Sequence, residues 1–133
     1  MTGRRFWLSV AAIWAITSAL LIVITWSAIV AWRFPDPDDQ MRLLQVRDWL
    51  AGQSWFDLTQ HRLNDPAGVP MHWSRVVDLP IAAMILTLRP LLGQLAAEHV
   101  ALVVVPLLTL GVVMALVAAL ARPLIARRLI DIA

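Results

Sequence analysis

Residues 6–32 read FWLSVAAIWAITSALLIVITWSAIVAW, and this run of 27 residues between Arg5 and Arg33 contains no charged side chain. As a helix it extends about 40 Å at roughly 1.5 Å per residue, more than the roughly 30 Å hydrocarbon core of a bilayer. A secretory signal peptide has an apolar core of about 7–15 residues and a small-residue cleavage site, which this run lacks. The run therefore predicts that residues 1–33 form a short N-terminus and a first transmembrane helix.

The composition of the whole chain supports a membrane protein. Apolar residues make up 60% of the 133 residues, charged residues make up 15%, and the mean hydropathy is +0.74, values too apolar for a soluble domain of this size. The pI near 11.0 reflects the absence of Lys and Tyr, not a basic patch, so we expect no nucleic-acid partner. Cysteine is absent, which excludes disulfides and Cys-ligated metal sites.

Two further apolar runs predict more helices. Val100–Ala121 is an uncharged run of 22 residues and is long enough to span a bilayer. Val76–Leu88 is read as a short second span, with Arg89 near its exit and residues 93–99 as the turn into the third span. The predicted fold class is all-α: a polytopic membrane protein with about three transmembrane helices and one helical exported loop.

Arginine placement predicts the topology. Arg4 and Arg5 flank the first run and favour a cytoplasmic N-terminus, which places the loop 34–78 in the periplasm of a bacterial inner membrane. That loop holds seven Asp against four Arg, a net charge of −3 where the rest of the chain carries +5, as expected for an exported segment. With three spans, however, the Arg-rich segment 122–133 would lie outside, against the positive-inside rule, unless it begins a further helix.

The domain division that follows has four parts. Residues 1–33 carry the first span, residues 34–75 form an exported acidic loop with short helices, and residues 76–121 hold the second and third spans. Membrane lipid is the expected surrounding, and small residues spaced four apart in the first run offer a surface for partner membrane helices.

The loop begins with an acidic turn, the DPDD sequence at 36–39. We expect a helix over Asp39–Ala51, ended by Gly52, with its aspartates where the helix dipole favours negative charge. Asp36, Asp38 or Asp39 could simply cap that helix, for which one residue suffices at about 0.5–2 kcal/mol. Alternatively, all three could hold Mg²⁺ or Mn²⁺, cations that prefer carboxylate oxygens and can neutralise a phosphate leaving group. The spacing alone leaves both alternatives open and slightly favours capping.

The wider motif order from Phe34 to about Ile85 resembles the first exported loop of oligosaccharyltransferase catalytic subunits of the GT-C superfamily. A first span is followed by an acidic turn, a short helix ending in Gly, a W-F-D segment, an N-x-P-x-G turn, a Trp and a second span. The elements are Asp36-Pro37 with Arg42, Gly52, Trp55-Phe56-Asp57, Asn64 with Pro66 and Gly68, and Trp73.

The resemblance implies a glycosyltransferase that uses a polyprenyl-phosphate-linked sugar donor. It implies that Asp36 is the catalytic metal ligand, whereas Asp38 and Asp39 stand where the family usually has other residues, so their roles stay open. Arg42 is expected to brace the acidic loop. The later acidic motif, further catalytic carboxylates and soluble domain of the family are missing from the 133 residues, so the expectation is an N-terminal fragment that is inactive alone.

Two other functional classes stay open. The chain could be a small non-catalytic membrane subunit or scaffold that docks through Trp49, Trp55 and Trp73 and needs no cation. It could also be a single-pass sensor, an alternative that fails if Val100–Ala121 crosses the membrane. The three histidines lack a metal-ligand spacing, and an interfacial, hydrogen-bonded role is expected for His99.

Overall fold

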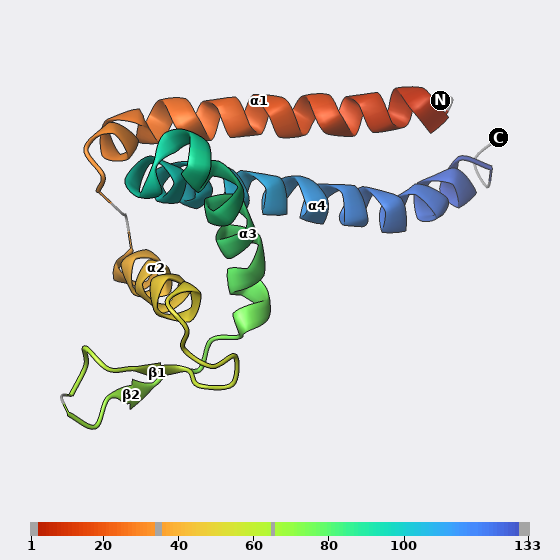
Figure 1. The fold of residues 1–133 in the computed structure, drawn as a ribbon. Coiled ribbons are helices and arrows are strands. Elements are labelled where there is room, and N and C mark those ends of the chain that lie inside the picture. Colours follow the sequence, from red (N-terminus) through yellow and green to blue (C-terminus); the bar gives the residue numbers. More distant parts are fainter. Residues whose placement is uncertain (1–2, 34–35, 65, 131–133) are drawn as a thin grey trace. The chain divides into compact units, whose positions relative to one another are not determined.

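The computed structural model describes residues 3–33, 36–64 and 66–130, with side chains up to residue 123. The protein is mostly helical, and within these residues there are four helices and one two-stranded ribbon (Figure 1). The expectations for Phe34 and for the side chains of Arg127 and Arg128 lie outside the described residues. The elements are α1 (Gly3–Val30), α2 (Pro37–Leu50), β1 (Thr59–Gln60), β2 (Val69–Pro70), α3 (Arg75–Leu92) and α4 (Gln94–Ile130).

Two of the described helices are long and apolar enough to cross a membrane, namely α1 and the Gln94–Pro123 portion of α4. They contain the first and last apolar runs of the sequence. Only 6% of the most apolar window of α1, and 11% of that of α4, is buried within the chain. The core helix of a soluble protein would be mostly buried, so the exposure of these side chains favours a lipid environment.

The predicted second span is present as a helix, α3, but it is not one of these two. It carries Arg75, Asp78 and Arg89 within 18 residues, and both Arg75 and Asp78 are buried against the rest of the chain. The predicted turn over residues 93–99 is wrong. Gly93 is the single residue between α3 and α4, and its φ of +79° is enough to change the direction of the chain. The residues that follow it are already helical.

The chain divides into two compact units. We call one the helix-pair unit, which comprises Met1–Ile29 and Pro106–Ala133, and the other the central unit, which comprises Val30–Val105. The division differs from the four parts read from the sequence, because residues 94–105 of the last apolar helix pack with the loop that precedes them.

In the helix-pair unit, α1 runs antiparallel to the second half of α4 (Figure 1). The indole N–H of Trp14 donates a 2.8 Å hydrogen bond to the carbonyl oxygen of Leu107. One turn further along α4, Gly111 lies under the same indole ring, where a Cβ would come within 2.9 Å of its nitrogen. Near the other end of the pair, the Arg122 guanidinium lies 5.6 Å from the centre of the Phe6 ring. The start of α1 therefore lies beside Arg122, eight residues before the end of α4.

In the central unit, α2, α3 and the first part of α4 share a small apolar core. The core side chains are Leu43 and Val46 of α2, Ile81, Ala82 and Ile85 of α3, and Ala101 and Val105 of α4. At the start of this unit, the ring of Trp32 packs on the ring of His99 in α4, with centroids 4.0 Å apart. Trp32, two residues after the end of α1, is thereby held beside the first turns of α4.

Candidate functional site

The acidic turn begins α2. Asp36 has the extended backbone of an N-cap, and its carboxylate accepts a 2.9 Å hydrogen bond from the backbone N–H of Asp38. Pro37 occupies the first helical position, where no N–H is needed, and Asp38 and Asp39 lie in the first turn. The helix therefore starts two residues earlier than the Asp39 expected from the sequence, because the cap is Asp36.

The three aspartates are exposed and close enough to repel one another. The atoms around Asp39 remove part of its hydration, and this desolvation together with the charge of Asp36 raises the pKa of Asp39. A bound cation would relieve such crowding. Nevertheless, among the side chains that the structure describes, no three His, Asp or Glu residues gather in a way that could hold a metal. The acidic turn by itself does not fit a complete Mg²⁺ or Mn²⁺ site.

Arg42, which is expected to brace the acidic loop, reaches from α2 to the far end of that loop. Its Nη1 donates to Oδ1 of Asp78 in α3 at 3.1 Å, and its guanidinium lies 5.0 Å from the centre of the Trp73 ring. Arg42 and Trp73, both part of the motif order, therefore meet in space and join α2 to the start of α3.

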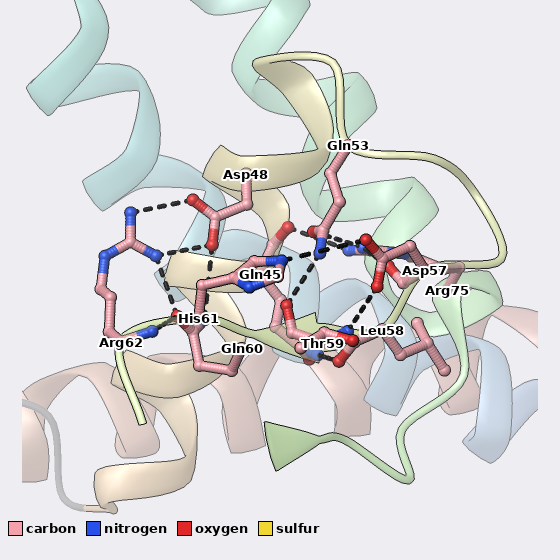
Figure 2. Close-up of polar contacts among 10 residues, drawn as sticks. All are labelled: Gln45, Asp48, Gln53, Asp57, Leu58, Thr59, Gln60, His61, Arg62 and Arg75. Atoms are coloured by element: carbon pink, nitrogen blue, oxygen red, sulfur yellow. Dashed lines mark hydrogen bonds and ion pairs between the residues drawn. The ribbon is translucent and has the colours of Figure 1, made fainter. Parts of the chain in front are cut away.

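Arg75 is the centre of a buried polar network (Figure 2), and its side chain is almost fully enclosed. Its Nη1 donates to the carbonyl oxygen of Gln45 at 2.9 Å, while Nη2 donates to Oε1 of Gln53 and to the carbonyl oxygen of Asp57. Asp78 supplies the nearest opposite charge at 3.7 Å. One guanidinium thus ties α2, the segment after it and α3 together, as a fork of five donors can.

A second ion pair lies at the other side of this network. Arg62 forms two hydrogen bonds to the carboxylate of Asp48, of 2.6 and 2.8 Å, and Nη1 also donates to Oε1 of buried Gln60. The bidentate bond from Arg62 holds the pKa of Asp48 below the ordinary aspartate value. Figure 2 shows these residues between α2 and the ribbon.

The ribbon makes the turn that the N-x-P-x-G pattern predicts. Strand β1 pairs antiparallel with β2, with Thr59 opposite Pro70 and Gln60 opposite Val69. Asn64 and Gly68 both adopt positive φ, 52° and 74°, and the N–H of Gly68 donates to the carbonyl oxygen of Asn64. A Cβ at Gly68 would lie 2.5 Å from Cγ2 of Thr59, so glycine is required there for space as well as for backbone conformation.

The sequence reasoning missed the ion pair between Arg47 and Glu98. Arg47 in α2 donates from Nε and Nη2 to the two oxygens of Glu98 at 2.8 and 2.6 Å, and Nε2 of Gln94 donates to one of them at 2.6 Å. Glu98 is completely buried. The only sign of this ion pair in the sequence is a carboxylate close to the start of an apolar helix, where an unpaired charge is costly.

The remaining motif residues also lie within the central unit. Trp49 and Trp55 pack edge to face with centroids 5.2 Å apart, which ties the end of α2 to the segment after it. Gly52 ends α2 at φ +114°, and Phe56 next to this pair is 89% exposed. Comparison of the chain with protein-family models, with curated proteins and with solved structures returned no match.

Proposed function

We propose that the chain is an integral membrane protein with two spans, α1 and α4, and that the region between them lies on the outer side. The support is the pattern of contacts within each unit. Trp32, just after α1, packs on His99 near the start of α4, so the chain returns to the level at which it left the first span. On this proposal α3 does not cross the membrane, which suits its buried Arg75 and Asp78.

Two antiparallel spans also remove the conflict with the positive-inside rule. Arg4 and Arg5 at the start of α1 and Arg122 at the end of α4 then flank the membrane on one side. The proposed location is the inner membrane of a bacterium, with this arginine-rich side in the cytoplasm and the acidic loop in the periplasm. Alkaline-phosphatase fusions after residues 60 and 94 are then both active, whereas three spans predict an inactive fusion at 94.

We further propose that the central unit is the first-loop part of a GT-C-type glycosyltransferase that uses a polyprenyl-phosphate-linked sugar donor, and that it is inactive alone. The motif residues that carry the resemblance organise one folded unit: Asp36 caps α2, Gly52 ends it, Arg42 meets Trp73, and Gly68 closes the ribbon. The observation that carries the proposal is the acidic turn, because it holds more exposed carboxylates than a cap requires, and desolvation together with the charge of Asp36 raises the pKa of Asp39.

In this proposal Asp36 supplies one carboxylate at the membrane boundary, three residues beyond Arg33. Asp36, Asp38 and Asp39 alone do not complete such a site, since the described acidic side chains form no complete set.

The test separates capping from chemistry with two substitutions at Asp36. Asn caps helices about as well as Asp does, so Asp36→Asn keeps the cap and removes the charge, whereas Asp36→Ala removes both. Membranes of the source cell that carry each variant are assayed for sugar transfer from a radiolabelled lipid-linked donor. The proposal expects both variants to lose transfer. If Asp36→Asn transfers as well as the parent and only Asp36→Ala is weakened, the carboxylate is a cap and the proposal is wrong.

A non-catalytic subunit or scaffold is the second candidate function, and one observation favours it. The exposed Phe56 beside the Trp49–Trp55 pair is the kind of aromatic anchor that binding surfaces use. For this candidate, Phe56→Ser abolishes co-purification of a membrane partner while Asp36→Asn leaves it intact. The transferase proposal expects the sensitivity at Asp36.

A further inference from the structure

A surface depression of about 500 Å³ lies in the central unit where α2 ends and α4 begins. Its walls combine charge with apolar surface. The lining includes Arg47, Leu50 and Ala51 at the end of α2, Arg89 at the end of α3, and Leu95 and Glu98 at the start of α4. This arrangement was not visible in the sequence, because the end of α2 lies about 40 residues before the other two segments.

The balance of charge in the depression is positive. Glu98 is fully buried, and both of its oxygens already accept hydrogen bonds, one of them from Gln94 as well as from Arg47. The carboxylate is therefore neutralised by Arg47, whose Nη1 still has no partner among the described residues. Arg89 is exposed, and within the described chain its guanidinium makes no hydrogen bond or ion pair. The site thus offers one excess positive charge and several free N–H donors.

An anion that fits these groups carries one negative charge and several acceptor oxygens, as a phosphodiester does. Guanidinium groups bind phosphate oxygens with paired, charge-assisted hydrogen bonds. The apolar rim suits the glycerol and first acyl carbons of a lipid, because Leu95 is 65% exposed and Leu50 is half-buried beside it. A free phosphate ion would use the arginines but would leave this apolar rim in water.

The position of the site in the chain also favours lipid as the source of the phosphate. The apolar helix α4 begins at Gln94, so the depression lies at the very start of a candidate membrane span. This is the level at which phospholipid headgroups and Arg side chains meet.

We propose that the depression formed by Arg47, Arg89 and Leu95 binds the phosphate headgroup of an anionic membrane lipid. Arg89 supplies the main free donors, and Arg47, held by Glu98, supplies the second. The proposal concerns a lipid of the surrounding bilayer, and it rests on the membrane location but not on the transferase activity.

The experiment measures lipid retained by the whole chain, purified in a neutral detergent, by native mass spectrometry. The probes are phosphatidylglycerol, zwitterionic phosphatidylcholine and inorganic phosphate. Arg89→Gln removes the free guanidinium, and Ala51→Glu places a carboxylate on the exposed rim. Arg33→Gln is the matched control, because Arg33 is also an exposed arginine of the central unit but lies outside the depression. Circular dichroism checks that each variant keeps its helix content.

We expect the parent and Arg33→Gln to retain one phosphatidylglycerol per chain, and Arg89→Gln and Ala51→Glu to bind it about tenfold more weakly, as for the loss of one charge-assisted contact. Equal weakening by Arg33→Gln would show a diffuse charge effect and overturn the site. Equal retention of phosphatidylcholine, whose phosphodiester charge is balanced by choline, would show that the site does not select an anionic lipid and would overturn the proposal. Displacement of the lipid by inorganic phosphate at the same concentration would assign the site to a soluble anion and refute the lipid proposal.

Discussion

The ion pair between Arg47 and Glu98 predicts an asymmetric response to mutation. Its two members differ in environment: the Arg47 side chain is 39% exposed, whereas the Glu98 side chain is 0% exposed. Arg47→Met leaves the Glu98 carboxylate buried without its cation. Glu98→Gln leaves Arg47 without its acid, but the guanidinium can turn into water, and Gln still accepts one hydrogen bond.

The magnitudes follow from burial. Removing one partner of a buried ion pair costs about 3–5 kcal/mol when the remaining charge cannot be solvated. Arg47→Met should approach that range, and Glu98→Gln should cost about 1–2 kcal/mol, the value for a modest unpaired polar group. The double variant Arg47→Met/Glu98→Leu removes both charges and should lie close to the parent, because an apolar pair of similar volume often replaces a buried ion pair at little cost.

The assay is reversible unfolding of the purified chain in mixed micelles of increasing SDS fraction, followed by tryptophan fluorescence. A double-mutant cycle of the parent, Arg47→Met, Glu98→Leu and the double variant gives the coupling energy between the two side chains, and Glu98→Gln is measured beside them. The order expected for unfolding free energy is parent and double variant highest, Glu98→Gln next and Arg47→Met lowest. The reasoning is refuted if the two single variants are equally destabilised, or if the double variant is as unstable as Arg47→Met.

Three further predictions concern other contacts. Arg62 lowers the pKa of Asp48 below the ordinary aspartate value of about 3.9. The pair therefore stabilises the protein at neutral pH, and this stability is lost as the pH falls through the lowered pKa. In pH-dependent unfolding, Asp48→Asn should cost about 0.5–1 kcal/mol at pH 7 and almost nothing near pH 2. Gly68→Ala should destabilise the central unit by about 1–3 kcal/mol, because of the positive φ and the clash with Thr59. When Thr59→Ser is added to Gly68→Ala, a denaturant titration should show recovery of only the free energy lost to the clash. Trp14→Phe, which loses the hydrogen bond to α4, should weaken the helix pair by about 0.5–1.5 kcal/mol in SDS unfolding, and an unchanged midpoint would contradict the role of that bond.

Local features of the fold were predictable from the sequence because they depend on neighbouring residues. The uncharged run 6–32 predicted α1, and α2 was found within two residues because Asp36, Pro37 and Gly52 are start and stop signals in their own right. The turn at Asn64–Gly68 was likewise readable from its residue types.

The pairings were not predictable, because they join residues far apart in the chain. Nothing near Glu98 indicates that Arg47, 51 residues earlier, neutralises it, and the same holds for Arg42 and Asp78. The same limit applies to the helix α3. Its apolar content is high enough to suggest a span, but Arg75 and Asp78 face the interior of the central unit, and only the tertiary structure shows that. The proposed metal ligands Asp36, Asp38 and Asp39 stay a prediction.

The buried carboxylate at the head of α4 also constrains how the protein is made. A ribosome delivers Arg47 well before Glu98, so when the last helix enters the insertion machinery its cationic partner has already emerged. If the intervening region is exported, α2 must cross the bilayer and fold before α4 can take its final position. Otherwise the Glu98 carboxylate near the start of α4 has no cation beside it. Biogenesis would then proceed in a fixed order, and a variant slow to fold α2 would stall with its second helix outside the lipid and become a substrate for membrane quality-control proteases.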